Sequence, residues 1–205
     1  MVSKVIKSTI IVVLSFIVFN TNNLKAQSFK EGKSFIQAGY GVGNFMSSIF
    51  QAYQDIDEDM TSVWTGPLFA KFEYALTDKI GMGVNIAYAG ATVSYEDAGH
   101  LNSNGDVYKE TITWSNISFL IRMNLHFGKN KLVDPYWGFG LGYRTGSTKY
   151  ENNDNTYNSK EISSLFPLGL ETTLGIRVMF AQHIGMYIEA GIAKAVLQGG
   201  LTVSF

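Results

Sequence analysis

Residues 197–205 read LQGGLTVSF, and their side chains alternate in character. One side of the two-residue period holds Leu197, Leu201, Val203 and Phe205, and the other holds Gln198, Thr202 and Ser204. Successive side chains of a β-strand point to opposite faces of the sheet. The stretch therefore predicts a strand with one apolar face and one polar face.

The same alternation recurs in seven segments before this one. They cover residues 34–42, 64–76, 80–92, 116–127, 135–143, 166–180 and 184–192. Segment 116–127 is the clearest, because large apolar residues occupy every odd position from Ile117 to Phe127. The segments are roughly 9–13 residues long, close to the ~9–11 that a tilted membrane-spanning strand needs. The pattern predicts an all-β fold of eight strands.

The connections between the segments alternate between long and short. Long polar stretches at 46–62, 96–106 and 151–163 are separated by short turns at 77–79, 128–134 and 181–183. Membrane barrels have long loops on the outside and short turns in the periplasm. The spacing predicts an antiparallel, up-and-down transmembrane β-barrel, closed by pairing of the first strand with the last.

The two faces of the segments differ in size as well as polarity. Phe, Leu, Ile, Trp and Met dominate one face, and Gly, Ala, Ser, Thr and Asn the other. An eight-stranded barrel has an interior only just wide enough for side chains, so the bulky face is expected to contact lipid. Two aromatic girdles are expected, with Tyr74, Phe127, Tyr136, Trp137, Phe180 and Phe205 at the inner end and Trp64 and Trp114 at the outer end.

The first 26 residues have the pattern of a cleavable signal peptide. Lys4 and Lys7 precede an apolar run at residues 10–19, and a polar stretch then leads to Ala26. We expect residues 1–26 to be the signal peptide and residues 27–205 the barrel domain. Without the first 26 residues, 13 basic and 17 acidic side chains remain, so a nucleic-acid partner is not expected.

Six charged residues fall on the small-residue face: Lys71, Glu73, Arg122, Glu171, Arg177 and Glu189. Three are basic and three acidic, and they come from four different segments. An unpaired charge in a narrow lumen is costly, so mutual pairing is expected. We interpret these residues as a structural charge network that fills the lumen; a path or gate for protons or ions is the alternative.

Residues suited to catalysis or metal binding do not form a recognisable site. The three histidines, His100, His126 and His183, have no serine in a nucleophile arrangement nearby, and the chain has no cysteine. Asp55, Asp57 and Asp59 have the first spacing of a calcium loop, but Met60 and Gly66 stand where that loop needs Gly and Glu. We expect no enzyme activity and no cofactor, with a weak divalent-ion site in this acidic loop as an open alternative.

The signal peptide, the eight segments, the inward charges and the GGLTVSF terminus together resemble the small eight-stranded outer-membrane barrel family, which includes OmpX and the membrane domain of OmpA. The resemblance covers about residues 33–205. It implies a monomer in the outer membrane that contacts lipid and lipopolysaccharide. It also implies that Leu201, Val203 and Phe205 form the assembly signal read by the barrel-assembly machinery.

The sequence thus favours a non-enzymatic outer-membrane barrel with a filled lumen. Its role would be structural in the envelope, or an interaction at the surface through three outer loops. Two alternatives stay open, which are a narrow pore for ions or small solutes and a secreted lipocalin-like binding protein. The second requires the bulky apolar side chains to face inward.

Overall fold

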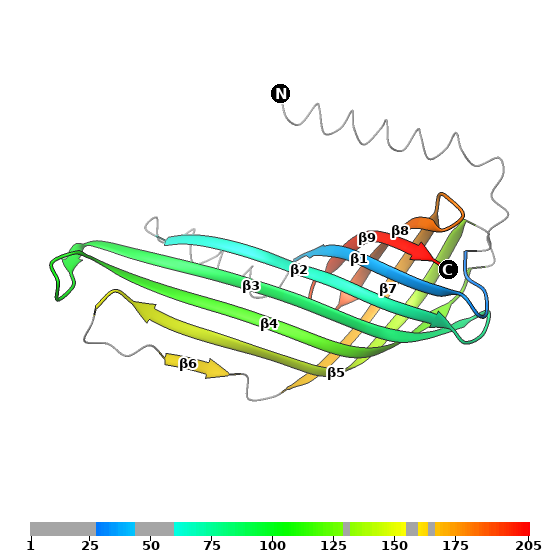
Figure 1. Ribbon diagram of the computed structural model, residues 1–205, viewed down its shortest axis with the longest axis horizontal. Coiled ribbons are helices and arrows are strands. Elements are labelled where there is room, and N and C mark those ends of the chain that lie inside the picture. Colours follow the sequence, from blue (N-terminus) through cyan, green and yellow to red (C-terminus); the bar gives the residue numbers. More distant parts are fainter. Residues whose placement is uncertain (1–27, 44–59, 129–131, 155–159, 164–166) are drawn as a thin grey trace, which may run out of the picture.

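The computed structural model describes residues 28–43, 60–128, 132–154, 160–163 and 167–205. Its strands are β1 (Ser34–Val42), β2 (Met60–Ala75), β3 (Ile80–Leu101), β4 (Val107–His126), β5 (Val133–Asn152), β6 (Lys160–Ser163), β7 (Leu168–Met179), β8 (Ile184–Ile192) and β9 (Leu197–Ser204) (Figure 1). Within these ranges, no helix is long and apolar enough to cross a membrane.

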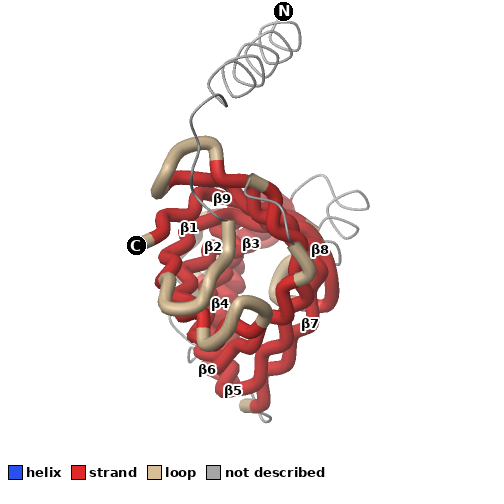
Figure 2. Tube along the Cα trace, turned by 90° about the vertical axis from the view of Figure 1, so that its right-hand side faces the viewer, coloured by secondary structure: helices blue, strands red, loops and turns tan. Residues whose placement is uncertain are grey.

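Eight of the strands form a closed antiparallel ring. Its order is β4-β3-β2-β1-β9-β8-β7-β5, and the pairing of β5 with β4 completes it. The short strand β6 pairs only with β5, outside the ring. Figure 2 shows the ring from the end that carries the C-terminus. The predicted eight-stranded up-and-down barrel is confirmed.

The first and last strands close the barrel. β1 pairs with β9 over the register Phe35↔Ser204 to Val42↔Leu197. This pairing leaves neither strand with an open ladder of backbone groups inside the membrane, where such groups have no water to bond. The C-terminus lies at the same end as the short turns (Figure 1), and we call this the inner end.

The bulky apolar side chains face outward from the ring. Ile121, Leu141 and Leu174 are 59%, 57% and 65% exposed, whereas Leu120, next to Ile121, is 1% exposed. A lipocalin needs the opposite arrangement, so the structure excludes that alternative. The lumen is less uniformly small than predicted, because it also holds aromatic rings from Phe35, Phe69, Tyr136 and Tyr187.

Strands β2 to β5 continue well beyond the barrel at the outer end (Figure 1). We call residues 60–65, 90–101, 107–116 and 144–152 the outer extension. The predicted loops at 96–106 and 151–163 are therefore partly wrong, since β3 continues to Leu101 and β6 lies within the second loop. Only residues 102–106 connect β3 to β4. Most of the predicted loop at 46–62 lies outside the described residues.

Aromatic side chains mark the two edges of the lipid-facing band. Tyr74, Phe127, Trp137 and Phe205 face outward at the inner end, as predicted, and Tyr40, Tyr88 and Tyr143 face outward near the outer end. Along β4 and the residue that follows it, the band runs from Ile117 to Phe127, about 33 Å along the strand, or about 25 Å at the usual tilt of about 40°. This height matches an outer-membrane barrel.

Three aromatic residues do not belong to the predicted girdles. Tyr136 is only 1% exposed and lies in the lumen. Trp64 and Trp114 lie in the outer extension, on the face that continues the lumen. Both pair with Ala91, and paired residues on neighbouring strands face the same side of the sheet; the side chain of Ala91 is buried. A bulge between Thr65 and Leu68 of β2 shifts the alternation at Trp64, and the sequence pattern alone did not reveal this shift.

Candidate functional site

The six charged residues singled out in the sequence all lie in the lumen. None is more than 6% exposed. The structure brings them together in two adjacent groups that cross the ring. The central cluster consists of Lys71, Arg122, Glu171 and Glu189, and the inner cluster consists of Glu73, Arg177, His126 and Asp134.

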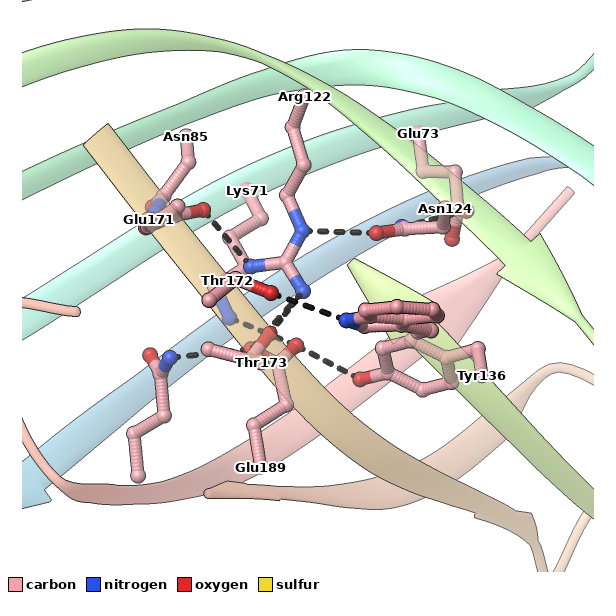
Figure 3. Close-up of polar contacts among 12 residues, drawn as sticks. Lys71, Glu73, Asn85, Arg122, Asn124, Tyr136, Glu171, Thr172, Thr173 and Glu189 are labelled. Carbon is pink, nitrogen blue, oxygen red and sulfur yellow. Dashed lines mark hydrogen bonds and ion pairs between the residues drawn. The ribbon is translucent and has the colours of Figure 1, made fainter. Parts of the chain in front are cut away.

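Glu189 on β8 is the hub of the central cluster (Figure 3). Its carboxylate is 2.9 Å from the Lys71 Nζ atom of β2 and 2.9 Å from an Arg122 nitrogen of β4. Tyr136, Thr173 and Gln198 also donate hydrogen bonds to it, at 2.7, 3.0 and 3.0 Å. Such charge-assisted bonds are the strong ones in a dry interior, so side chains from five other strands all bind one carboxylate on β8.

Arg122 connects Glu189 to the second carboxylate of the central cluster. Its Nη1 atom lies 3.0 Å from Glu171 on β7, and Glu171 also accepts a 2.8 Å hydrogen bond from Asn85 on β3. Glycines make room for these side chains. A methyl group at Gly138 would overlap the Arg122 guanidinium, and one at Gly140 would overlap the Glu171 side chain. These two glycines of the small-residue face thus lie beneath the cluster.

Glu73 on β2 is the hub of the inner cluster. It pairs with Arg177 of β7, which lies opposite β2 in the ring. It also contacts the Nε2 atom of His126 at 2.8 Å. Asn124 joins the two clusters, because it donates to Glu73 at 2.6 Å and accepts from Arg122 at 2.8 Å. The network therefore runs without a break from one cluster to the other.

Both ring nitrogens of His126 face carboxylates. Nδ1 is 2.9 Å from Asp134, and Nε2 faces Glu73. A carboxylate without a proton only accepts hydrogen bonds, so the arrangement fits an imidazolium with a proton on each nitrogen. The two clusters contain four carboxylates and three side chains from Lys and Arg. A charged His126 therefore makes the network neutral.

Two members of the inner cluster were not predicted to belong to it. The sequence placed His126 on the lumen face without a partner, and it placed Asp134 in a turn. Asp134 is 0% exposed and belongs to β5. Extending the alternation of Tyr136 and Gly138 back by one step would have placed it in the lumen. No sequence signal indicated that Phe29, before β1, stacks on His126 with ring centroids 3.5 Å apart.

A lysine from the β8–β9 connection occupies the outer part of the lumen. The Lys194 ammonium donates hydrogen bonds to the backbone oxygens of Ala87 and Asn116, at 2.8 and 3.0 Å. Burial, together with the positive charge of Arg144, lowers the pKa of Lys194 to about 7. Ala195 beside it packs with Phe69 and Ala87. The β8–β9 connection therefore packs against the inner face of β2 and β3 in the outer part of the barrel.

The other candidate residues lie apart from the network. His100 stacks on Tyr108 in the outer extension, and His183 lies in the inner turn, where its ring contacts the Ser204 backbone oxygen. Asp55, Asp57 and Asp59 lie outside the described residues. Among the described residues, no group of His, Asp and Glu side chains is arranged to hold a metal ion. Leu201, Val203 and Phe205 face outward on and just after β9.

Similar folds occur among solved outer-membrane proteins. Ail of Yersinia pestis, solved with the heparin analogue sucrose octasulfate, is 15% identical, with 85% of this chain and 96% of that chain covered and a TM-score of 0.40. OprG of Pseudomonas aeruginosa is 14% identical, with 88% and 99% covered and a TM-score of 0.43. The N-terminal barrel domain of OprF from the same species is 15% identical, with 86% and 98% covered and a TM-score of 0.37.

No curated protein sequence matches this chain. The family profile described as "Outer membrane protein beta-barrel domain" matches residues 11–203, almost the whole chain. The closed ring, its outward apolar band and its aromatic edges agree with that match. The chain therefore belongs to the outer membrane protein beta-barrel domain family and is a protein of the outer membrane.

Proposed function

We propose that this protein is a non-enzymatic outer-membrane barrel with a closed lumen, and that it holds the outer extension at the cell surface. The observation that carries the proposal is the pairing of charges across the ring. Glu73 and Arg177 come from opposite strands, and Lys71 and Glu189 come from strands three places apart. Side chains that meet across the lumen in this way leave little room for a solute.

The surroundings of His126 support a role without catalysis. A general base needs a free nitrogen within hydrogen-bond reach of the proton that it removes. Both nitrogens of His126 already face carboxylates. Ser118 lies on the same strand, eight residues before His126, and its hydroxyl is 3.5 Å from the backbone oxygen of Ala87. It is therefore not placed as a nucleophile beside the His126 ring.

The charge of the outer extension and its connections limits the class of surface partner. Within the described part, the acidic residues beyond the membrane band on β3 to β6 are Glu96, Asp97, Asp106, Glu110, Glu151, Asp154 and Glu161, and the basic ones are Lys109, Arg144, Lys149 and Lys160. This excess of acids disfavours a polyanionic ligand. The sulfated sugar named with Ail is therefore not proposed as a ligand of this chain.

Release of small solutes from liposomes tests the closed lumen. We expect vesicles that contain the refolded protein to retain potassium ions and small sugars as well as protein-free vesicles do. Different gel mobility of boiled and unboiled samples shows that the barrel is folded. Rapid release of either solute from vesicles with folded protein would contradict the closed lumen.

A narrow pore is the second candidate, and one observation favours it. In the part of the chain that the structure describes, nine buried side-chain polar atoms have no hydrogen-bond partner, and four of them form one group: Gln37 Nε2, Tyr187 OH, Gln198 Oε1 and Thr202 Oγ1. All four lie on β1, β8 and β9, beside the central cluster. Buried polar groups usually form hydrogen bonds with protein atoms or with water. A row of water molecules bound to these four atoms is the route that a pore would use. Ion release without sugar release would favour this candidate.

A further inference from the structure

The outward face of β4 changes chemistry where the strand leaves the membrane band. From Phe127 back to Ile117 every outward position is large and apolar. The next outward positions are Ser115, Thr113 and Thr111. The pairing of β4 with β3 and β5 has no register shift over this stretch. The same face of the same strand therefore passes from hydrocarbon-type to hydroxyl-type side chains.

The neighbouring strands change at the same level. On β3, Thr92 and Ser94 follow Tyr88 on the outward face, and on β5, Thr145, beside Ile117, and then Ser147 follow Tyr143. We define the hydroxyl face as Thr92, Ser94, Thr111, Thr113, Ser115 and Ser147. Hydroxyl groups meet between strands at Ser94 and Thr111, 3.3 Å apart, and at Ser115 and Ser147, 3.4 Å apart.

The position of the hydroxyl face relative to the membrane follows from strand geometry. Its first row, at Ser115, lies about 7 Å along β4 beyond Ile117, and its last, at Thr111, about 20 Å beyond. The face is continuous with the lipid-facing surface below it and points in the same direction. It therefore lies against the headgroup layer of the outer leaflet, just above Tyr88 and Tyr143.

The chemistry of the face fits a neutral polar partner. A hydroxyl both donates and accepts hydrogen bonds, and all six residues are partly exposed. The charges on the same face of β3 to β5 are paired, with Lys109 2.7 Å from Glu96 and Lys149 2.6 Å from Glu151. Phosphate recognition relies on free Lys or Arg side chains, and acyl chains need an apolar surface.

We propose that the hydroxyl face docks against the oligosaccharide headgroups of the outer-leaflet glycolipid. The sugar hydroxyls would exchange hydrogen bonds with Thr113 and its neighbours, and the extension would stand upright in the sugar layer. The inference depends on the position of the barrel in the outer membrane. It does not depend on whether the lumen is closed, so solute release from liposomes leaves it unaffected.

Single cysteines test this contact cleanly, because the chain has no cysteine of its own. Thr113→Cys places a thiol on the hydroxyl face. The matched control, Ile162→Cys, places one on the opposite face at the same level, since Ile162 pairs with Thr148 and Thr148 pairs with Trp114. Each full-length variant is refolded into phospholipid vesicles that contain lipopolysaccharide with its core sugars, or lipid A alone. The labelling rate with a membrane-impermeant maleimide is then measured.

We expect the core sugars to slow the labelling of Thr113→Cys roughly tenfold relative to lipid A vesicles, the factor given by ~1.4 kcal/mol of contact. The labelling of Ile162→Cys should change by less than about twofold, well under ~1 kcal/mol. Equal slowing at both positions would show general crowding by sugars and overturn the proposal. Equal rates for Thr113→Cys in both kinds of vesicle would overturn it as well.

Discussion

At the scale of single residues, the alternation of the sequence placed six charged side chains on the lumen face, and the structure brings all six together. The alternation could not give their partners, because pairing depends on how the ring closes. Glu73 lies 104 positions before Arg177 and meets it only in the closed barrel. Asp134 and Phe29 were not predicted for local reasons, since Asp134 is the second residue of β5 and Phe29 precedes β1.

Glu189→Gln is expected to destabilise the barrel strongly. The change leaves Lys71 and Arg122 facing a neutral group, and removing one partner of a buried ion pair costs about 3–5 kcal/mol. Urea unfolding in lipid vesicles measures the loss in the free energy of unfolding. Glu151→Gln is the matched control, since it breaks the exposed pair with Lys149 and should cost less than about 1 kcal/mol. Equal losses for the two variants would argue against the clusters as a stabilising network.

Lys194 is expected to lose its proton near neutral pH. Its pKa is about 7 in the fold against an ordinary value of 10.5. Between these values the unfolded chain binds more protons than the folded one, so the free energy of unfolding rises as pH rises from about 7. An NMR titration of the Lys194 side chain in micelles should show a midpoint near 7 that disappears in Lys194→Met. A midpoint near 10.5 would refute the burial of this ammonium group.

At the scale of elements, the sequence predicted the membrane part of each strand better than its length. Period-two alternation identifies a strand only while one face is apolar and the other polar. Beyond Tyr88 and Ile117 this contrast is reversed, because the outward positions carry Thr and Ser, whereas Val93, Ile112 and Trp114 face the inside. Thr, Val and Tyr favour β-structure, and the ladder between β3 and β4 continues. The polar stretch was therefore read as loop.

Asn102 is expected to hold the tip of the extension in place. Its side-chain oxygen accepts hydrogen bonds from the Asn104 and Asp106 backbone amides, each at 2.9 Å, and its amide donates to the Asn153 backbone oxygen at 3.0 Å. Asn102→Ala removes all three bonds. Hydrogen exchange should speed up roughly tenfold or more at the tip, as expected for the loss of about 1.4 kcal/mol, with no change in the barrel strands. Unchanged exchange at the tip would contradict this role.

At the scale of the whole molecule, the pattern of faces and connections was enough to predict the closed ring. Long and short connections gave the up-and-down order, and the bulky face gave the lipid side. The positions of the aromatic girdles were harder to predict, because β2 and β4 extend beyond the membrane and carry Trp64 and Trp114 there, and the bulge in β2 turns Trp64 to the inward face. Tyrosines at positions 40, 88 and 143 mark the outer edge instead.

Phe205→Gln is expected to lower the amount of folded protein in the outer membrane. Phe205 is 64% exposed on the outward side, and its backbone pairs with Ser34 at the closure of the barrel. We propose that Leu201, Val203 and Phe205 are read by the barrel-assembly machinery before the ring closes. Membrane fractionation with a heat-mobility gel measures the effect, and Ile192→Gln, at another exposed apolar position, is the control. Wild-type levels of Phe205→Gln would contradict the assembly signal.

The central claim is that charged side chains meeting across the ring close the lumen. Current through a planar lipid bilayer that contains the purified wild-type protein tests this claim most directly. We predict no discrete current steps above the baseline of the protein-free bilayer when heat-dependent gel mobility shows that the sample is folded. Reproducible openings of one unitary size would contradict the closed lumen and would assign the unpartnered polar atoms on β1, β8 and β9 to a conducting path.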